Sequence, residues 1–335
     1  MSPVFVNSVL LLGSAAVIYF ACEFFVNGVE WVGRKLSVGS TATGTILAAF
    51  GTALPESVVT FVAVAFGGSH AQKDIGVGAA LGGPLVLATV AYGVVGVGLL
   101  ASRQPLKKTP DVERQFKRLS RDQGWFLGIF IFKIGLGLIT FAFKPWLGVL
   151  FLAAYAFYFW QEMRNDERGE KDDDLEPLKI SPKQAAPSTA LALVQTGVAL
   201  AVIFLASRIF VSQLDDIGPA LGLPPQLLAL LLSPIATELP ETMNAIIWVR
   251  QGKHRLALAN ISGAMMIQAT VPTAFGIFWT PWLLERSLIL AAAVTTLAVA
   301  VLFVTFRRGV ISRSLLASMG LFYALFVAVL FVLPQ

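Results

Sequence analysis

The sequence predicts an all-α membrane protein with ten transmembrane helices arranged as two inverted five-helix repeats. Three observations predict this fold: recurrent apolar stretches, a one-sided distribution of Lys and Arg, and a motif that occurs twice. Of the 335 residues, 56% are hydrophobic and 13% are charged, whereas soluble domains carry roughly 25% charged residues. The lipid bilayer is therefore an expected partner, and the basic balance is explained by membrane topology without nucleic acid.

The apolar stretches are each long enough to cross a hydrocarbon core of roughly 30 Å. The first is too long for a signal peptide and lacks a basic start, so it is expected to remain as a helix. Transmembrane helices are expected at residues 4–32, 38–66, 74–100, 124–143, 145–163, 188–213, 226–249, 255–280, 282–306 and 313–333.

The basic residues test this division, because cytoplasmic loops collect Lys and Arg. With the N-terminus outside, 20 of the 25 basic residues fall in loops predicted to be cytoplasmic, and four fall in outside loops. The remaining one, Lys133, lies midway along the fourth expected helix. This split predicts an integral protein of the cell membrane with its N-terminus outside.

Two hydrophilic stretches, at residues 101–123 and 164–187, are expected as cytoplasmic loops. The second divides the chain into a first repeat, residues 1–163, and a second repeat, residues 188–335. Its acidic residues do not have the spacing of an ordered Ca²⁺ loop, so a solvated linker is favoured over a regulatory Ca²⁺ site.

One motif occurs in each half, within an otherwise apolar helix. Residues 51–56 read G-T-A-L-P-E and residues 236–241 read A-T-E-L-P-E. Because each half has an odd number of helices, the second half enters the membrane from the opposite side. Inverted repeats of this kind place their interrupted helices face to face. The two motif glutamates, Glu56 and Glu241, are therefore expected to lie together.

The motif has the chemistry of a cation site. Pro55 and Pro240 lack an amide hydrogen, so each frees backbone carbonyls within its helix. A divalent cation such as Ca²⁺ binds about six to eight oxygens, and a carboxylate at bilayer depth is costly enough that function is its default interpretation. The predicted ligands are Glu56 and Glu241, with neutral oxygens from Thr52, Thr237, Asn260 and Gln268.

Other interpretations stay open for the neutral residues. Asn260 and Gln268 could form hydrogen bonds between helices, and Thr52 and Thr237 could bond their own helix backbone. Lys133 is either a functional cation near the site or the structural partner of an acid such as Glu23.

An enzyme is not expected, because the chain has two histidines and one cysteine from which to build a catalytic site. No resident cofactor is expected either. A cation channel or uniporter using the same carboxylates remains the alternative to a transporter.

These residues resemble the Ca²⁺/cation antiporter superfamily, which includes sodium/calcium and proton/calcium exchangers. The motif of that superfamily is close to G-T-S-L-P-E in each repeat, followed by a helix reading G-N-x-x-G-S. Residues 259–264 keep part of the second element, and residues 78–83 keep little of it. The resemblance implies that Glu56 and Glu241 bind Ca²⁺ and that Thr52 and Thr237 contribute.

The resemblance also implies a secondary active antiporter that exchanges Ca²⁺, or a similar divalent cation, for H⁺ or Na⁺ by alternating access. Several departures favour H⁺. Ala79, Gly83 and Leu87 replace polar positions of the first repeat, and Gln268 falls where sodium exchangers carry an acid. Glu238 replaces the motif serine and lies on nearly the same helix face as Glu241, which adds it to the predicted ligands. The coupling ion, the stoichiometry and the oligomeric state stay open.

Overall fold

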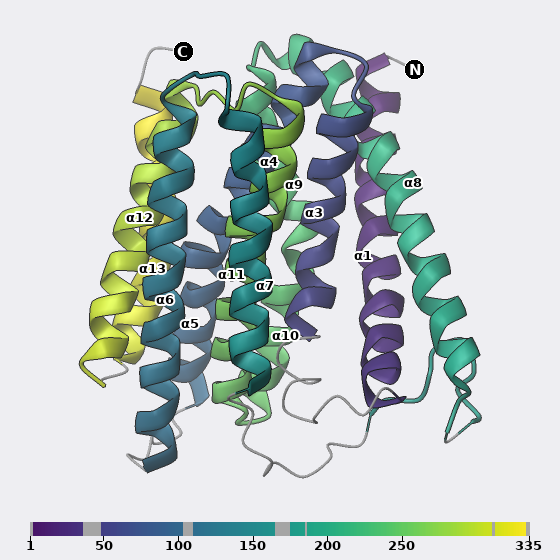
Figure 1. Ribbon diagram of the computed structural model, residues 1–335, viewed down its shortest axis with the longest axis vertical. Coiled ribbons are helices and arrows are strands. Elements are labelled where there is room, and N and C mark those ends of the chain that lie inside the picture. The colour runs from purple at the N-terminus through teal and green to yellow at the C-terminus, as the bar shows by residue number, and fades with distance from the viewer. Residues whose placement is uncertain are drawn as a thin grey trace.

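The computed structural model describes residues 3–35, 48–102, 110–164, 175–184, 186–309 and 312–332, and these contain helices and no strand. The helices run along one common direction as a bundle (Figure 1). They are α1 (Pro3–Lys35), α3 (Ala48–Phe66), α4 (His70–Val86), the π-helix η2 (Leu87–Ala91), α5 (Tyr92–Ser102), α6 (Pro110–Gly137), the 3₁₀ helix η3 (Lys144–Leu147), α7 (Gly148–Arg164), α8 (Thr189–Leu221), α9 (Pro225–Thr237), α10 (Leu239–Arg250), α11 (His254–Trp279), α12 (Arg286–Arg307) and α13 (Arg313–Val332).

The helices identify an integral membrane protein. Within the described residues, six helical segments are long and apolar enough to cross a bilayer, and two shorter apolar helices accompany them. Helix α1 begins at the end of the bundle where α13 ends (Figure 1), so the chain crosses the membrane an even number of times. The expected count of ten, the inversion of the repeats and the boundaries of the two halves stay predictions. The six segments are Val4–Lys35, His70–Ala101, Thr189–Leu221, Leu256–Trp279, Arg286–Arg307 and Arg313–Leu330.

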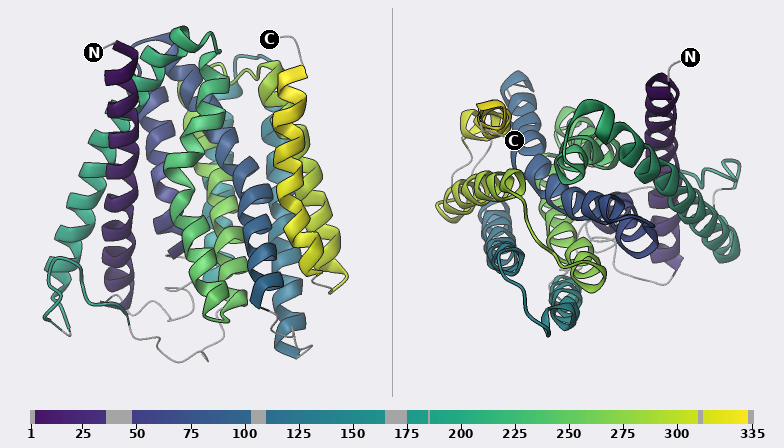
Figure 2. Two further views of the ribbon diagram at one scale, coloured as in Figure 1. Left: turned by 180° about the vertical axis from the view of Figure 1, so that it is seen from behind. Right: turned by 90° about the horizontal axis from the view of Figure 1, so that it is seen from above.

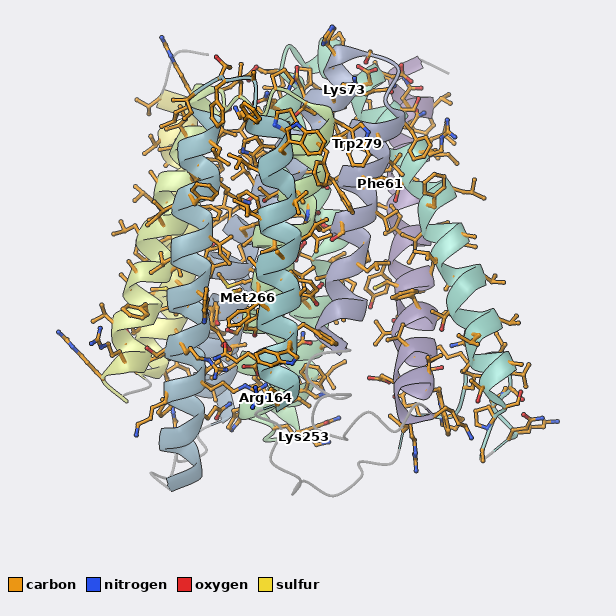
Figure 3. The ribbon with its side chains drawn as sticks, viewed as in Figure 1. Phe61, Lys73, Arg164, Lys253, Met266 and Trp279 are labelled. Atoms are coloured by element: carbon orange, nitrogen blue, oxygen red, sulfur yellow. The ribbon has the colours of Figure 1, made fainter. Side chains whose placement is uncertain are left out.

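Three basic residues lie at the ends of the bundle that the sequence predicts for them. Arg164 and Lys253, both assigned to cytoplasmic loops, lie at one end, whereas Lys73, assigned to an outside loop, lies at the other (Figure 3). The grouping agrees with the predicted topology, while the orientation in the cell stays a prediction.

Two expected boundaries were wrong. The hydrophilic stretch at 101–123 is helical from Pro110 onward, because α6 extends beyond its apolar part. Its charges are compensated within the fold, since Arg118 and Arg121 both pair with Glu162 of α7. The single helix expected at 226–249 is instead two helices, α9 and α10, with a break at Glu238.

Some expectations concern residues outside the described ranges. The start of the second expected helix and five acids of the linker, residues 167–174, fall there. The part of the linker that is described, 175–184, lies against α1: the Glu176 carbonyl accepts a 2.9 Å hydrogen bond from the Trp31 indole.

The bundle exposes apolar side chains on its outer faces and buries a group of polar side chains among the apolar ones of its core. Large apolar side chains such as Leu12, Phe20 and Leu205 are exposed on the outer faces of α1 and α8, as expected for surfaces that contact lipid. At the centre, α3 packs against α11 and α4 packs against α9, while α1 and α8 lie side by side at the edge (Figure 2). The buried polar side chains of the next section lie where these central helices meet.

Small residues allow some of these helices to approach closely. A Cβ atom added at Gly96 of α5 would lie 2.0 Å from the backbone nitrogen of Ala317 in α13, whereas one added at Gly128 of α6 would meet nothing within 4 Å. Close contact between α5 and α13 therefore requires glycine at position 96.

We expect Gly96→Ala to lower the stability of the folded protein by about 1–3 kcal/mol, because the added methyl overlaps backbone. Gly128→Ala is the matched control and should be neutral or stabilising, since Ala has the higher helix propensity. Thermal unfolding of both variants in detergent measures the difference, and equal melting temperatures would contradict the packing described.

Candidate cation site

Three glutamates lie in the interior of the bundle. Glu56 of α3 and Glu241 of α10 are 0% exposed, and Glu238, at the break between α9 and α10, is 1% exposed. In this conformation none of the three reaches solvent. Burying unpaired charge is so costly that such groups need a proton, a counterion or hydrogen-bond donors.

The Thr237 hydroxyl lies between two of these carboxylates. Its oxygen is 2.7 Å from Oε2 of Glu56 and 3.1 Å from Oε1 of Glu238, and the Ser233 carbonyl is also within 3.1 Å. A hydroxyl has one proton to donate, so it cannot satisfy all three acceptors together. The two carboxylates thus face each other with more acceptor oxygens than donors between them.

Gln268 of α11 completes this group. Its Nε2 lies 2.7 Å and 2.8 Å from the two oxygens of Glu238, and its own Oε1 has no hydrogen-bond partner among the residues described. Helix α4 reaches the same place through Gly83, where an added Cβ would lie 2.7 Å from Gln268 Oε1 and 3.0 Å from Glu238 Oε1. Any side chain at position 83 would disturb this pair.

Glu241 lies in the first turn of α10. Neither of its oxygens accepts a well-formed hydrogen bond within the described part of the chain, although the Thr52 hydroxyl is close enough to act on the carboxylate. Glu238 and Glu56 both act on Glu241 electrostatically. Each motif glutamate therefore lies beside the threonine of the other motif: Glu56 beside Thr237, and Glu241 beside Thr52.

The structure thus gathers Glu56, Glu238 and Glu241 in one interior region, but the direct bridge joins Glu56 to Glu238. The sequence predicted that Glu56 lies beside Glu241, whereas the hydroxyl bridge joins Glu56 to Glu238, the extra acid of the second motif. Among the described residues, no three His, Cys, Asp or Glu side chains are arranged closely enough to hold a metal ion by themselves. Neutral oxygens would have to complete any cation site here.

Asn260 supplies one such group. The side chain is 0% exposed, and both of its amide atoms lack a hydrogen-bond partner within the ranges that the structure describes. The alternative interpretation, hydrogen bonding between helices, is therefore not realised for Asn260 in this conformation. For Gln268 it is realised, through Glu238.

The break after α9 presents backbone as well as side chains. Pro240 has no N–H to bond the Ala236 carbonyl, and the C-terminal end of α9 carries the negative end of the helix dipole. Helix α3, in contrast, continues through Pro55, and the carbonyl of Gly51 accepts the Cys22 thiol at 3.6 Å. The two motifs therefore differ in how much free backbone they offer.

Three participants were missed or misjudged from the sequence. Ser233 lies 3.5 Å from Glu56 Oε2, and its spacing of four residues from Thr237 was the signal that could have identified it. Gly83 was noted only as a lost polar residue. Lys133 does not pair with Glu23, which instead binds Lys179 at 3.1 Å.

Two side-chain clusters flank the site along α11. Toward the Lys73 end, Phe61 of α3 packs against Phe275 and Trp279 of α11, with ring centroids 5.0 Å and 5.6 Å apart (Figure 3). Nearer the start of α11, Gln123 of α6 donates to the Tyr92 hydroxyl at 2.9 Å and to Ser262 at 3.3 Å. The first cluster is aromatic and partly exposed, and the second is polar and buried.

Comparison with known sequences gives a family and several relatives. A family model described as "Sodium/calcium exchanger protein" matches residues 6–161 and 191–332. Inner membrane protein YrbG of Escherichia coli (strain K12) is 24% identical over 275 residues, which cover 82% of this chain and 80% of YrbG. CaxA of Alkalimonas amylolytica is 23% identical over 284 residues, which cover 84% of this chain and 83% of CaxA.

Solved structures share the fold. The H⁺/Ca²⁺ exchanger CAX matches with a TM-score of 0.74 at 16% identity, covering 100% of this chain and 83% of CAX. A sodium-calcium exchanger soaked with Na⁺ and Sr²⁺ matches with a TM-score of 0.61 at 19% identity, covering 97% of this chain and 99% of the exchanger. At these identities the likeness establishes the architecture alone.

The bridging hydroxyl can be tested by removing it without changing the side-chain shape. We expect Thr237→Val to destabilise the protein by about 1–3 kcal/mol, because buried carboxylate oxygens lose their donor. Thr270→Val is the control, since the Thr270 hydroxyl bonds only carbonyls of its own helix. Thermal unfolding in detergent without divalent cations compares the two, and an equal effect of both substitutions would argue against a bridge.

Proposed function

The chain belongs to the sodium/calcium exchanger protein family, within the Ca²⁺/cation antiporter superfamily, and on that premise we propose that it exchanges Ca²⁺, or a similar divalent cation, for H⁺ by alternating access. The observation that carries the proposal is the shared Thr237 hydroxyl between two fully buried carboxylates. A divalent cation seated between those carboxylates would supply the positive charge that one hydroxyl does not.

The proposed ligands are the three acids together with the neutral oxygens around them. Glu56 and Glu238 would bind the cation from opposite sides, and Glu241 would join as the third carboxylate. The Oε1 of Gln268 and the amide oxygen of Asn260 are buried without partners in the described chain, so a cation would gain ligands without breaking existing bonds. The full set is Glu56, Glu238, Glu241, Thr52, Thr237, Asn260 and Gln268.

Exchange follows from competition for one site. Protons and a divalent cation are alternative ways to neutralise the same carboxylates, so each displaces the other. The choice of H⁺ over Na⁺ rests on the residues present: Ala79, Gly83 and Leu87 offer no polar side chain from α4 and η2 for additional monovalent ions.

Alternating access requires that each side of the site can open while the other stays closed. The aromatic cluster between α3 and α11 and the polar cluster around Gln123 would act as the two gates of such a cycle. The reciprocal packing of α3 on α11 and of α4 on α9 supports two inverted halves of five helices each. The proposed location in the cell membrane, with the N-terminus outside, rests on the distribution of Lys and Arg in the sequence.

The function is tested by ⁴⁵Ca²⁺ uptake into proteoliposomes under separately imposed H⁺ and Na⁺ gradients. We expect a proton gradient to drive uptake and a sodium gradient to have no effect. Glu56→Gln and Glu241→Gln should each reduce uptake by at least about tenfold, because a neutral amide weakens binding of a divalent cation to a site built on carboxylates.

Glu23→Gln is the matched control, since Glu23 also lies in a membrane helix but pairs with Lys179 and is partly exposed. It should transport like the unmodified protein. Normal uptake by both site variants would refute the assignment. Uptake that carries current with no counterion on the far side would instead identify a channel or uniporter.

A further inference from the structure

Lys133 is the one fully buried lysine of the described chain, at 0% exposure. It lies in α6, within the interior of the bundle, with its ammonium 4.9 Å from the centre of the Phe130 ring. Its backbone is four residues before the end of α6 at Gly137, yet the side chain reaches into the interior, where a charged group is costly to bury. A position of this kind requires an explanation beyond packing.

The ammonium binds a carbonyl that a proline has made available. Lys133 Nζ donates to the Ala80 carbonyl at 3.1 Å. In a regular helix that carbonyl would accept the N–H of residue 84, but residue 84 is Pro84, inside α4, and has no N–H to give. A carbonyl freed in this way can bind a cation, and here it accepts a hydrogen bond from the ammonium of Lys133.

The position adjoins the acidic site. Ala80 is less than one helical turn from Gly83, whose Cα faces Gln268 and Glu238. Lys133 also interacts electrostatically with Glu56. The ammonium therefore lies on the α4 side of the carboxylates, where the first repeat has lost its polar side chains.

The two halves of the chain are unequal at this point. At corresponding positions the second half keeps Asn260 and Gln268, whereas the first half has Ala79 and Leu87. The first half, which lacks these two polar side chains, contains Lys133 and Pro84 near the same place. One half thus presents neutral ligands to the site, and the other presents a fixed positive charge.

We propose that the Lys133 ammonium is a tethered cation that occupies, on the first-half side of the carboxylates, the place of a mobile monovalent ion. The protein then carries one monovalent cation fewer in each cycle. This inference rests on the proposed exchange function. It identifies Lys133 as the residue that removes the need for Na⁺ in the exchange. Lys133 acts as a specificity-determining residue because its positive charge is attached to the chain and cannot be exchanged.

The chain offers a matched control in Lys144. Its ammonium is also buried and also binds backbone carbonyls, those of Ile139 at 2.6 Å and Trp282 at 3.0 Å. It lies in η3, at one end of the bundle. Lys144→Gln therefore makes the same chemical change away from the acidic site.

The experiment measures the melting temperature of the full-length protein in detergent as Na⁺ replaces choline at constant ionic strength. Lys133→Gln keeps a donor for the Ala80 carbonyl but removes the charge. We expect Na⁺ to raise the melting temperature of this variant by a few degrees, because an ion that binds only the folded state stabilises it. The unmodified protein and Lys144→Gln should show no such rise.

An equal response of Lys133→Gln and Lys144→Gln to Na⁺ would overturn the proposal. Lys133→Met provides a second variant with the same expectation. If both Lys133 variants fail to fold even in Na⁺, the proposal is also refuted, because the mobile ion should replace the missing charge. Stabilisation of the unmodified protein by Ca²⁺, compared with Glu56→Gln, tests the exchange function separately.

Discussion

The structure depends on how negative charge is neutralised in a medium that cannot solvate it. Glu56, Glu238 and Glu241 are withdrawn from water, and one threonine hydroxyl lies between two of them. Other features of the interior answer that constraint: the amide of Gln268 donates to Glu238, and the ammonium of Lys133 lies on the α4 side of the carboxylates. The apolar helices around this centre contact lipid and keep the surrounding medium free of water.

The sequence was enough to predict an all-helical membrane protein and the presence of Glu56 and Glu241 in its interior. The length of the apolar stretches, the one-sided distribution of Lys and Arg and the doubled motif can all be seen directly in the sequence. The early start of α6 was missed, because hydropathy treats charged residues as loop. Arg118 and Arg121 both pair with Glu162, 41 residues or more away in the chain, and Arg121 also lies near Asp122.

The finer geometry could not be read from the sequence, because it depends on contacts between distant segments. The bridge from Glu56 to Glu238 depends on Thr237, the last residue of α9, whose hydroxyl lies between oxygens of the two carboxylates. The bond from Lys133 to Ala80 depends on a proline four residues further along α4 and on the packing of α6 against the centre. Neither contact follows from local helix propensity. The need for glycine at position 83 is likewise evident only from the position of Gln268.

The two clusters that flank the site differ in polarity. In the proposed cycle, water would pass Phe61, Phe275 and Trp279 only after their rings separate. Tyr92, Gln123 and Ser262 already hold polar atoms to which incoming water would bond as it enters. Hydration would therefore advance gradually past one cluster and abruptly past the other, and the two half-cycles of the proposed exchange would differ in their sensitivity to temperature.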